Sequence, residues 1–382
     1  MKKNVMVMLS YVLVAALATV ITLATAPRYM LSEGKLSQLE ALIQEKYIGE
    51  ADLTVMEDAA ADAMVAATGD KWSYYIPASE YAAYQERMAN AYVGVGITIQ
   101  AQENEGGFLI IDVAAGGPAE EAGLQVGDVI VGVADQDVTA ATSTEVRELV
   151  KGEEGTFVNM TVRRQGGSLT LSVERRQVQT PVAAGTLLEG NIGLVTIENF
   201  DSRCAEETIA AIETLLAEGA EKLIFDVRHN PGGYASELVK VLDYLLPEGE
   251  LFRAVSYDGK ENIDYSDADF LEIPMAVLVN GSSYSAAEFF AAALSEYEAA
   301  VVVGEKTSGK GYFQQTYRLS DGSAVSLSVG KYYTPKGNSL AETGVTPDIL
   351  IPVDEETAAA IYYGTLDPME DPHILKAIEA MK

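Results

Sequence analysis

Four short apolar runs between residues 192 and 303 constrain the fold of this chain more than any other feature. The runs are continuous and rich in β-branched residues, and they occupy residues 192–197, 223–227, 275–279 and 300–303. Such runs are typical of strands that are buried on both faces. Helical segments at 205–218, 234–246 and 285–298 separate them. The alternation predicts a largely parallel sheet, in which ligands collect where strands end and turns lead into helices.

Residues 92–178 show a different pattern, in which short runs of alternating apolar and polar residues are separated by glycines. Strands are predicted at 93–99, 108–113, 128–133, 157–163 and 169–173, and helices at 118–122 and 143–151. This many short elements in so few residues indicates a compact, partly open β-barrel. The pattern before it, from residue 32 to about 90, is helical.

The N-terminus predicts a membrane anchor. Lys2 and Lys3 precede an uncharged apolar run over residues 4–26, which is long enough to cross a bilayer as a helix. The lysines should stay on the cytoplasmic side, which places everything after Arg28 outside. Residues 24–26 resemble a signal-peptidase site, but Pro27 follows them directly and suits such a site poorly. An uncleaved anchor is therefore favoured over a cleaved signal, which would give a secreted protein, and over a buried core helix.

Charge and residue counts exclude several classes. The formal net charge of −31 and the lack of a basic patch argue against nucleic acid as a partner. The single cysteine, Cys204, excludes an internal disulfide, so the fold must depend on packing. Only two histidines occur, His229 and His373. A catalytic base therefore has few candidates among the histidines.

The stretch VNGSSYSAAEFF at residues 279–290 places three serines between an apolar run and a helix. Ser285 could begin that helix as the N-terminal half of a capping box with Glu288. It could also be a nucleophile, but this role needs a base. His229 on the preceding turn is one candidate, and a neutral lysine is the other.

Lys310 lies between two glycines after the last apolar run. If residues 310–315 are extended, Lys310, Tyr312 and Gln314 share one face by the two-residue alternation. A free lysine, with a pKa of ~10.4, is charged at neutral pH and cannot act as a base. Burial can lower this pKa by ~3 units, and the amide oxygen of Gln314 could orient the amine without a negative charge. A solvated surface lysine is the alternative.

Another turn, residues 226–233, reads Asp-Val-Arg-His-Asn-Pro-Gly-Gly. Gly232 and Gly233 begin a helix, and their N–H groups could hold an oxyanion. These glycines could equally mark only the start of a helix.

Together and in this order, the three turns resemble those of the carboxyl-terminal processing peptidases, also called tail-specific proteases. Residues 226–233 match Asp-Leu-Arg-Asn-Asn-Pro-Gly-Gly with His229 in place of an Asn, and residues 304–311 match Gly-Glu-x-Thr-x-Gly-Lys-Gly. The family's Ser-Ala-Ser-Ala-Ser-Glu aligns its reactive serine with Ser285, although Tyr284 and Ala287 depart from it. The likeness covers nearly everything after residue 32.

This resemblance implies a Ser-Lys endopeptidase. It assigns Ser285 as nucleophile, Lys310 as base and Gln314 as the group that orients the base. The oxyanion would be held by the N–H of Ala286 and that of Gly232 or Gly233.

Residues 92–97 and 117–128, with their glycines and Pro118, resemble a PDZ domain. The resemblance implies that a peptide's terminal carboxylate and last residues bind at one loop and the strand after it. The residues concerned are Val93, Gly94, Val95, Gly96, Ile97 and Ile99. Apolar C-terminal tails of protein substrates are the expected ligands, and the domain could also gate the active site.

The predicted fold class is α/β (α+β multidomain). The predicted parts are a membrane anchor (1–30), a helical region (31–90), a PDZ domain (91–178), a crotonase/Clp-like protease core with a largely parallel sheet (179–350) and a C-terminal helical segment (351–382). The predicted function is that of a membrane-anchored, extracytoplasmic serine endopeptidase without a metal or other cofactor. A homodimer through residues 32–90 and the C-terminal segment is suggested by the family alone.

Three alternatives stay open: a catalytically idle scaffold, a Ser-His hydrolase that uses His229, and a crotonase-like acyl-CoA enzyme. Intact Ser285, Lys310 and Gln314 argue against the scaffold. The acyl-CoA enzyme would need a basic nucleotide-binding surface, which so acidic a chain does not suggest.

Overall fold

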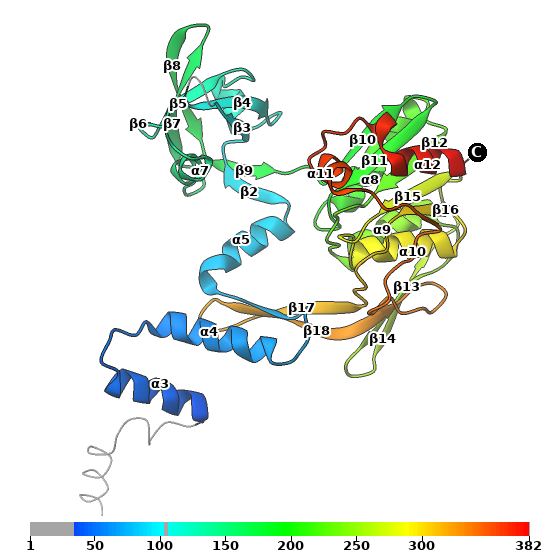
Figure 1. The fold of residues 1–382 in the computed structure, drawn as a ribbon, viewed down its shortest axis with the longest axis horizontal. Helices are drawn as coiled ribbons and strands as arrows, with labels where there is room; N and C mark the ends of the chain where they lie inside the picture. Colours follow the sequence, from blue (N-terminus) through cyan, green and yellow to red (C-terminus); the bar gives the residue numbers. More distant parts are fainter. Residues whose placement is uncertain (1–33, 103–105, 382) are drawn as a thin grey trace, which may run out of the picture. The chain divides into compact units, whose positions relative to one another are not determined.

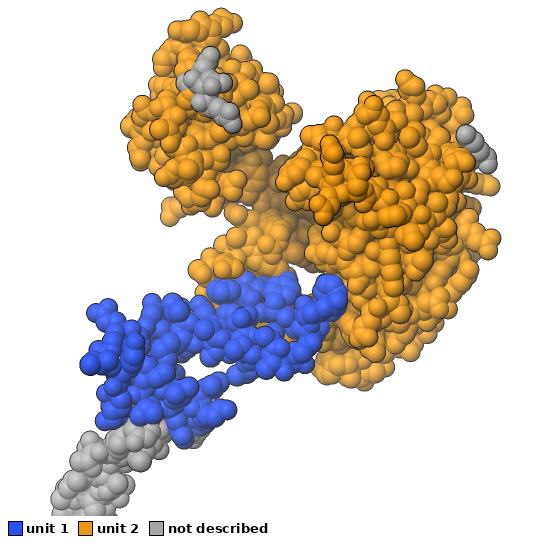
Figure 2. Space-filling view, viewed as in Figure 1, with its two compact units in different colours: residues 1–77 blue, residues 78–382 orange. Residues whose placement is uncertain are grey.

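The computed structural model of the protein describes residues 34–102 and 106–381. The chain divides into two compact units, residues 1–77 and residues 78–382, which Figure 2 colours separately. The described part of the first unit contains α3 (Lys35–Lys46), α4 (Leu53–Ala66) and the short strand β1 (Tyr74–Ile76). Asp52 caps α4 by accepting the N–H of Val55 at 3.2 Å, which satisfies one of the donors left open at a helix start.

The membrane anchor predicted at residues 4–26 lies outside the described residues. Across residues 34–102 and 106–381, no helix combines the length and the apolar character that crossing a bilayer requires.

The second unit begins with α5 (Ala78–Met88) and continues into a small β-domain. The elements of this domain are β2 (Ala91–Gly94), β3 (Ile97–Ala101), β4 (Phe108–Val113), α6 (Pro118–Ala122), β5 (Val129–Val133), β6 (Gln136–Asp137), α7 (Ser143–Val150), β7 (Phe157–Arg164), β8 (Gly167–Glu174) and β9 (Arg176–Gln179). They agree closely with the predicted elements, except that the single strand expected at 93–99 is two strands, β2 and β3, and that β6 and β9 were not predicted. The chain turns between them at Gly96, whose φ of +77° favours glycine.

An antiparallel sheet of order β3-β4-β5-β7-β8 forms this β-domain, and β6 pairs with β5. The entering strand β2 pairs with the leaving strand β9 in a separate ladder. Val95, Ile110, Ile130 and Val146 belong to one buried apolar cluster of the domain. Within residues 34–102 and 106–381, β3 pairs only with β4, so its other edge is open to the rest of the described chain.

The rest of the unit is built on a six-stranded sheet of order β10-β11-β12-β15-β16-β19 (Figure 1). Its strands are β10 (Ala183–Leu188), β11 (Ile192–Ile197), β12 (Lys222–Asp226), β15 (Met275–Val279), β16 (Ala300–Gly304) and β19 (Ile349–Leu350). All neighbours are parallel except β10 and β11. The prediction of a largely parallel sheet is therefore confirmed.

Helices cover both faces of this sheet. Side chains that alternate along the strands divide between two buried clusters, as the two-residue period requires. One cluster includes Val195, Phe225 and Val277 and packs against α8 (Cys204–Ala217), α9 (Ala235–Leu245) and α10 (Ala286–Glu296). The other includes Ile224 and Leu278 and packs against α12 (Pro372–Ala380).

A second, antiparallel sheet was not predicted. It contains β13 (Gly249–Ser256), β14 (Glu261–Ser266), β17 (Tyr312–Arg318) and β18 (Ala324–Tyr333). Its strands are joined in the order β17-β18-β13-β14. Strand β17 begins at Tyr312, so it contains Tyr312 and Gln314 but not Lys310. The C-terminal part adds α11 (Glu355–Tyr362) and the 3₁₀ turn η1 (Pro368–Glu370).

Candidate active site

Three turns at one edge of the parallel sheet contain the residues singled out in the sequence. The turns follow β12, β15 and β16, which are adjacent and parallel. The carboxyl ends of parallel strands lie at the same edge, so segments far apart in the chain come together there. The structure thus brings residues 226–233, 280–285 and 305–311 to one place.

Ser285 occupies a sharp turn between β15 and α10. Its φ of 60° and ψ of −121° lie outside the extended region that an ordinary helix N-cap adopts. A non-glycine residue with positive φ is strained and persists only where its surroundings enforce it. The neighbouring Ser283 is fully buried and donates to the carbonyl of Val227 at 2.7 Å. Ser283 therefore anchors the turn, and Ser285 is the serine held in an unusual conformation.

Gly232 explains why the preceding turn can lie so close to Ser285. A Cβ added at Gly232 would lie 2.6 Å from the Cβ of Ser285 and 2.8 Å from the nitrogen of Ala286. Gly232 also has a φ of +86°, which favours glycine. The close approach places this turn directly against the start of α10.

Glu288 joins the serine turn to the lysine turn. Its carboxylate is fully buried and accepts four hydrogen bonds. The donors are the N–H of Ser285 at 2.9 Å, the N–H of Lys310 at 2.8 Å, the N–H of Gly309 at 2.7 Å and the hydroxyl of Thr307 at 2.5 Å. The Glu288 half of the capping box therefore exists, but the same carboxylate also holds the lysine turn.

Lys310 lies beside Ser285. Both backbone nitrogens donate to the same oxygen, Oε2 of Glu288, so they are less than about 6 Å apart. The Nζ of Lys310 lies over the ring of Tyr284, 5.7 Å from its centroid.

Tyr332, on β18, was missed by sequence reasoning. Its hydroxyl donates to the carbonyl of Lys310. Burial and the nearby Glu288 raise the pKa of Tyr332, while a hydrogen bond to the Ser285 side chain lowers it by less. Tyr332 thus contacts both candidate catalytic residues. No local pattern marks it, because it comes from the unpredicted antiparallel sheet.

Gln314 is half-buried on β17. Its amide nitrogen donates to the carbonyl of Tyr312 at 3.0 Å and to the hydroxyl of Ser328 at 3.1 Å. These bonds fix the orientation of the amide. Its oxygen is then the end that can accept a hydrogen bond from another group.

The candidate oxyanion donors differ in their hydrogen-bond partners. The N–H of Gly232 donates to Oδ1 of Asn230 at 2.8 Å, so in this structure it already has an acceptor. Within the described residues, no acceptor is recorded for the N–H of Ala286 or of Gly233. The N–H groups of Ala286 and Gly233 are therefore the two remaining candidates for holding an oxyanion.

His229 has other partners. Its N–H donates to Oδ1 of Asn280 at 3.0 Å, and its Nε2 lies 2.8 Å from Nδ2 of the same side chain. Its ring meets that of Tyr362 edge-on, with centroids 5.1 Å apart. Burial, reinforced by Arg228, lowers the pKa of His229. The contacts of His229 therefore join its turn to the start of the serine turn and to α11.

Asp201, in the loop after β11, is a buried carboxyl next to the glycine turn. A Cβ at Gly233 would lie 2.5 Å from its nitrogen. Only 6% of Asp201 is exposed, and within the described part of the chain its Oδ1 has no hydrogen-bond partner. Burial raises the pKa of Asp201 to about 7, against a lowering by Arg87. Asp201 in turn contributes to raising the pKa of Tyr284, although burial is the larger cause.

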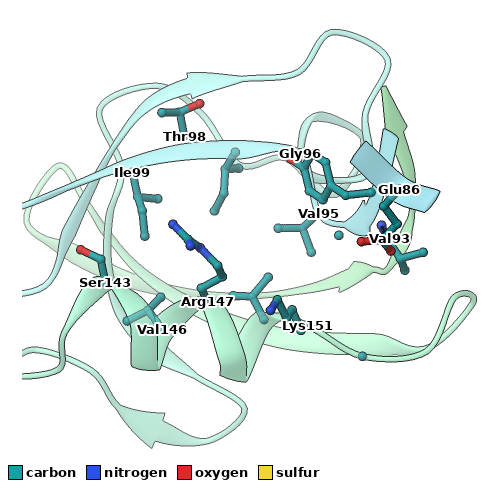
Figure 3. Close-up of a pocket in the computed structure, with 15 residues that line it drawn as sticks. Glu86, Val93, Val95, Gly96, Thr98, Ile99, Ser143, Val146, Arg147 and Lys151 are labelled. Carbon is teal, nitrogen blue, oxygen red and sulfur yellow. Dashed lines mark hydrogen bonds between the residues drawn. The ribbon is translucent and has the colours of Figure 1, made fainter. Parts of the chain in front are cut away.

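A groove of about 600 Å³ lies between β3 and α7 in the β-domain (Figure 3). All six residues predicted to bind a peptide line it: Val93, Gly94, Val95, Gly96, Ile97 and Ile99. Among residues 34–102 and 106–381, by contrast, no cluster of His, Cys, Asp and Glu is suited to hold a metal ion.

Two family models match the chain. Residues 191–351 match peptidase family S41, and residues 109–164 match the PDZ domain. The carboxy-terminal processing protease CtpA of Bacillus subtilis is 30% identical over 318 residues, which are 82% of this chain and 68% of that protein. A Staphylococcus aureus protein described as a CtpA-like serine protease is 28% identical over 83% of this chain and 64% of its own length. The chain thus spans about two thirds of these relatives.

Solved structures are also similar. A photosystem II D1 C-terminal processing protease is 28% identical, with a TM-score of 0.48 over 88% of this chain and 93% of that one. The tricorn protease has a TM-score of 0.50 and 16% identity over 76% of this chain and 29% of its own. The second likeness concerns the fold alone.

Glu288→Gln should lower the free energy of unfolding by about 3 kcal/mol and remove activity, because an amide NH₂ would face buried donors. Urea unfolding and peptide hydrolysis measure the two effects. Glu296→Gln is a matched control on the same helix, since this half-buried carboxylate accepts from Thr334, Lys336 and Asn338. It should keep activity and cost less stability. A stable, active Glu288→Gln protein would contradict the role given to Glu288.

Asp201 should make the protein less stable as pH rises. Its pKa is about 7 when folded, and about 3.9 is expected when unfolded, so the folded state holds the extra proton between these values. The stabilisation is complete below about pH 4 and is lost as pH rises through 7. Relative to Asp201→Asn, the wild type should lose roughly 2–4 kcal/mol of unfolding free energy between pH 4 and pH 8, as measured by urea unfolding. The exposed Asp258→Asn should retain the wild-type fall, and identical slopes for wild type and Asp201→Asn would count against the assignment.

Proposed function

We propose that this chain, which belongs to the carboxy-terminal processing proteases, cleaves protein substrates by a Ser-Lys mechanism. These are serine proteases of peptidase family S41, and the chain also has a PDZ domain. One observation carries the proposal. Ser285, in a strained turn, and Lys310, from a separate turn, are bound to the same buried carboxylate. A purely structural serine at a helix start needs neither the strain nor this neighbour.

In the proposed reaction, the hydroxyl oxygen of Ser285 attacks the scissile carbonyl carbon. The amine of Lys310 takes the hydroxyl proton and later gives it to the leaving amine. Water then hydrolyses the acyl-enzyme by the same route. Lys310 must be neutral to begin, and the amide oxygen of Gln314 would orient it without adding negative charge.

The N–H groups of Ala286 and Gly233 would hold the oxyanion that forms on the carbonyl oxygen. Ala286 is the first residue of α10, where N–H groups lack partners within the helix and the dipole favours negative charge. Because these two donors come from different turns, the oxyanion hole would depend on the close contact between the turns at Gly232.

The PDZ domain would capture C-terminal tails. The groove follows the open edge of β3, where an extended peptide can add as a strand. Its apolar lining, including Val95, Ile97 and Ile99, suits an apolar last residue. The neighbouring N–H groups would receive the terminal carboxylate.

An extracytoplasmic location, with residues 4–26 as anchor, is part of the proposal and is supported by the two lysines before the apolar run. A homodimer through residues 32–90 and the C-terminal segment stays a prediction from the family resemblance.

Lys310→Arg should be as inactive as Lys310→Ala, because a guanidinium with a pKa above ~12 cannot accept a proton. Both should reduce kcat/KM by at least about a thousandfold, close to Ser285→Ala, since the two residues act as a unit. Gln314→Ala should lose less, about tenfold to a hundredfold, because it only orients. Hydrolysis of a fluorogenic peptide measures each. An active Lys310→Arg enzyme would rule out the Ser-Lys mechanism.

His229→Asn separates this mechanism from a Ser-His one. The substitution should leave kcat/KM within about threefold of wild type, because His229 has no part in the proposed proton transfer. The same fluorogenic assay checks it, with circular dichroism to confirm folding. A folded variant as inactive as Ser285→Ala would favour His229 as the base.

A further inference from the structure

The PDZ groove has an apolar floor and a basic rim. Val146 is fully buried, and Val150, one turn further along α7, also lines the groove. Ser143, Arg147 and Lys151 are spaced four residues apart, so they form a second row along the same side of the helix. All three of these residues line the groove as well.

Arg147 is the cation that reaches into the groove. Figure 3 shows its side chain extending from α7 toward β3, near Ile99. Lys151 already donates to Glu148 at 2.7 Å. For the guanidinium of Arg147, no ion pair or hydrogen bond is recorded within the described parts of the chain. A guanidinium presents its donors in a planar fork that matches a carboxylate, so this position can bind an acidic side chain.

The groove fixes which residue of a bound tail would meet Arg147. A strand added to the edge of β3 places alternate side chains toward α7. The last side chain would lie near the loop at Gly94–Gly96, at the end of the groove where Figure 3 shows Lys151. Two residues of strand span about 6.8 Å, close to one helical turn of 5.4 Å. The side chain two residues before the last therefore falls about one turn back along α7, at the level of Arg147.

We propose that the PDZ groove selects tails that end in an apolar residue and carry Asp or Glu two residues before it. This rests on the proposed function, in which the groove binds C-terminal tails. The net charge of −31 repels an acidic peptide at long range, so the preference must come from contact with Arg147. The one acidic residue of the lining, Glu86, lies near Val93 at the loop end of the groove, away from Arg147 (Figure 3).

The test measures tail binding to the full chain carrying Ser285→Ala, so that no peptide is cleaved. Short dye-labelled peptides ending in Glu-Ala-Val, Gln-Ala-Val and Lys-Ala-Val are compared by fluorescence anisotropy. The Glu peptide should bind about tenfold more tightly than the Gln peptide, and the Lys peptide most weakly. Adding Arg147→Gln should abolish the difference, Arg147→Glu should favour the Lys peptide, and Lys151→Gln should keep the Glu preference.

Equal affinities for the Glu and Gln peptides would overturn the proposal, and so would a Glu preference that survives Arg147→Gln. An amidated Glu-Ala-Val peptide separates this outcome from failure of the proposed function. If amidation weakens binding but Glu gives no advantage, only the acidic preference fails. If free and amidated peptides bind alike, or none binds, the groove does not read C-terminal tails and both ideas fail.

Discussion

The buried carboxylate of Glu288 is the interaction on which the candidate active site depends. It receives donors from the serine turn and the lysine turn, which lie more than twenty residues apart in the sequence. A buried charge is costly unless hydrogen bonds replace its hydration, and four short bonds meet that need. If the carboxylate were removed, the donors of Thr307 and Gly309 would be buried without this partner. The two turns are therefore held together at a fixed distance.

The backbone and the amine of Lys310 have different neighbours. Glu288 binds Lys310 through its backbone N–H, while the amine end extends over the ring of Tyr284. A carboxylate paired with the amine itself would favour the charged form and oppose its use as a base. The backbone N–H of Lys310 thus has the structural role, and its amine has the proposed chemical role. Tyr332 adds a neutral contact between the same turn and Ser285.

Close backbone approach is the second constraint. The turn with Gly232 can lie against Ser285 only because no side chain intervenes. The strained conformation of Ser285 is held from one side by this contact and from the other by Glu288. In the PDZ domain the constraint is of another kind, because the open edge of β3 and the position of α7 define the groove, while Arg147 sets its charge.

The sequence by itself determined the parallel sheet and the three turns. Runs such as 192–197 and 275–279 are continuous, so their period and length identified them without knowledge of their neighbours. The same local patterns singled out Ser285, Lys310 and the glycines. Only the tertiary structure decided how they meet. It gave Glu288 a second role across 22 residues, directed the N–H of Gly232 to Asn230, and brought Tyr332 and Asp201 to the site. The strand that carries Tyr332, β18, pairs with β13 across more than 70 residues of sequence, and pairing of this kind leaves no periodic mark in the sequence.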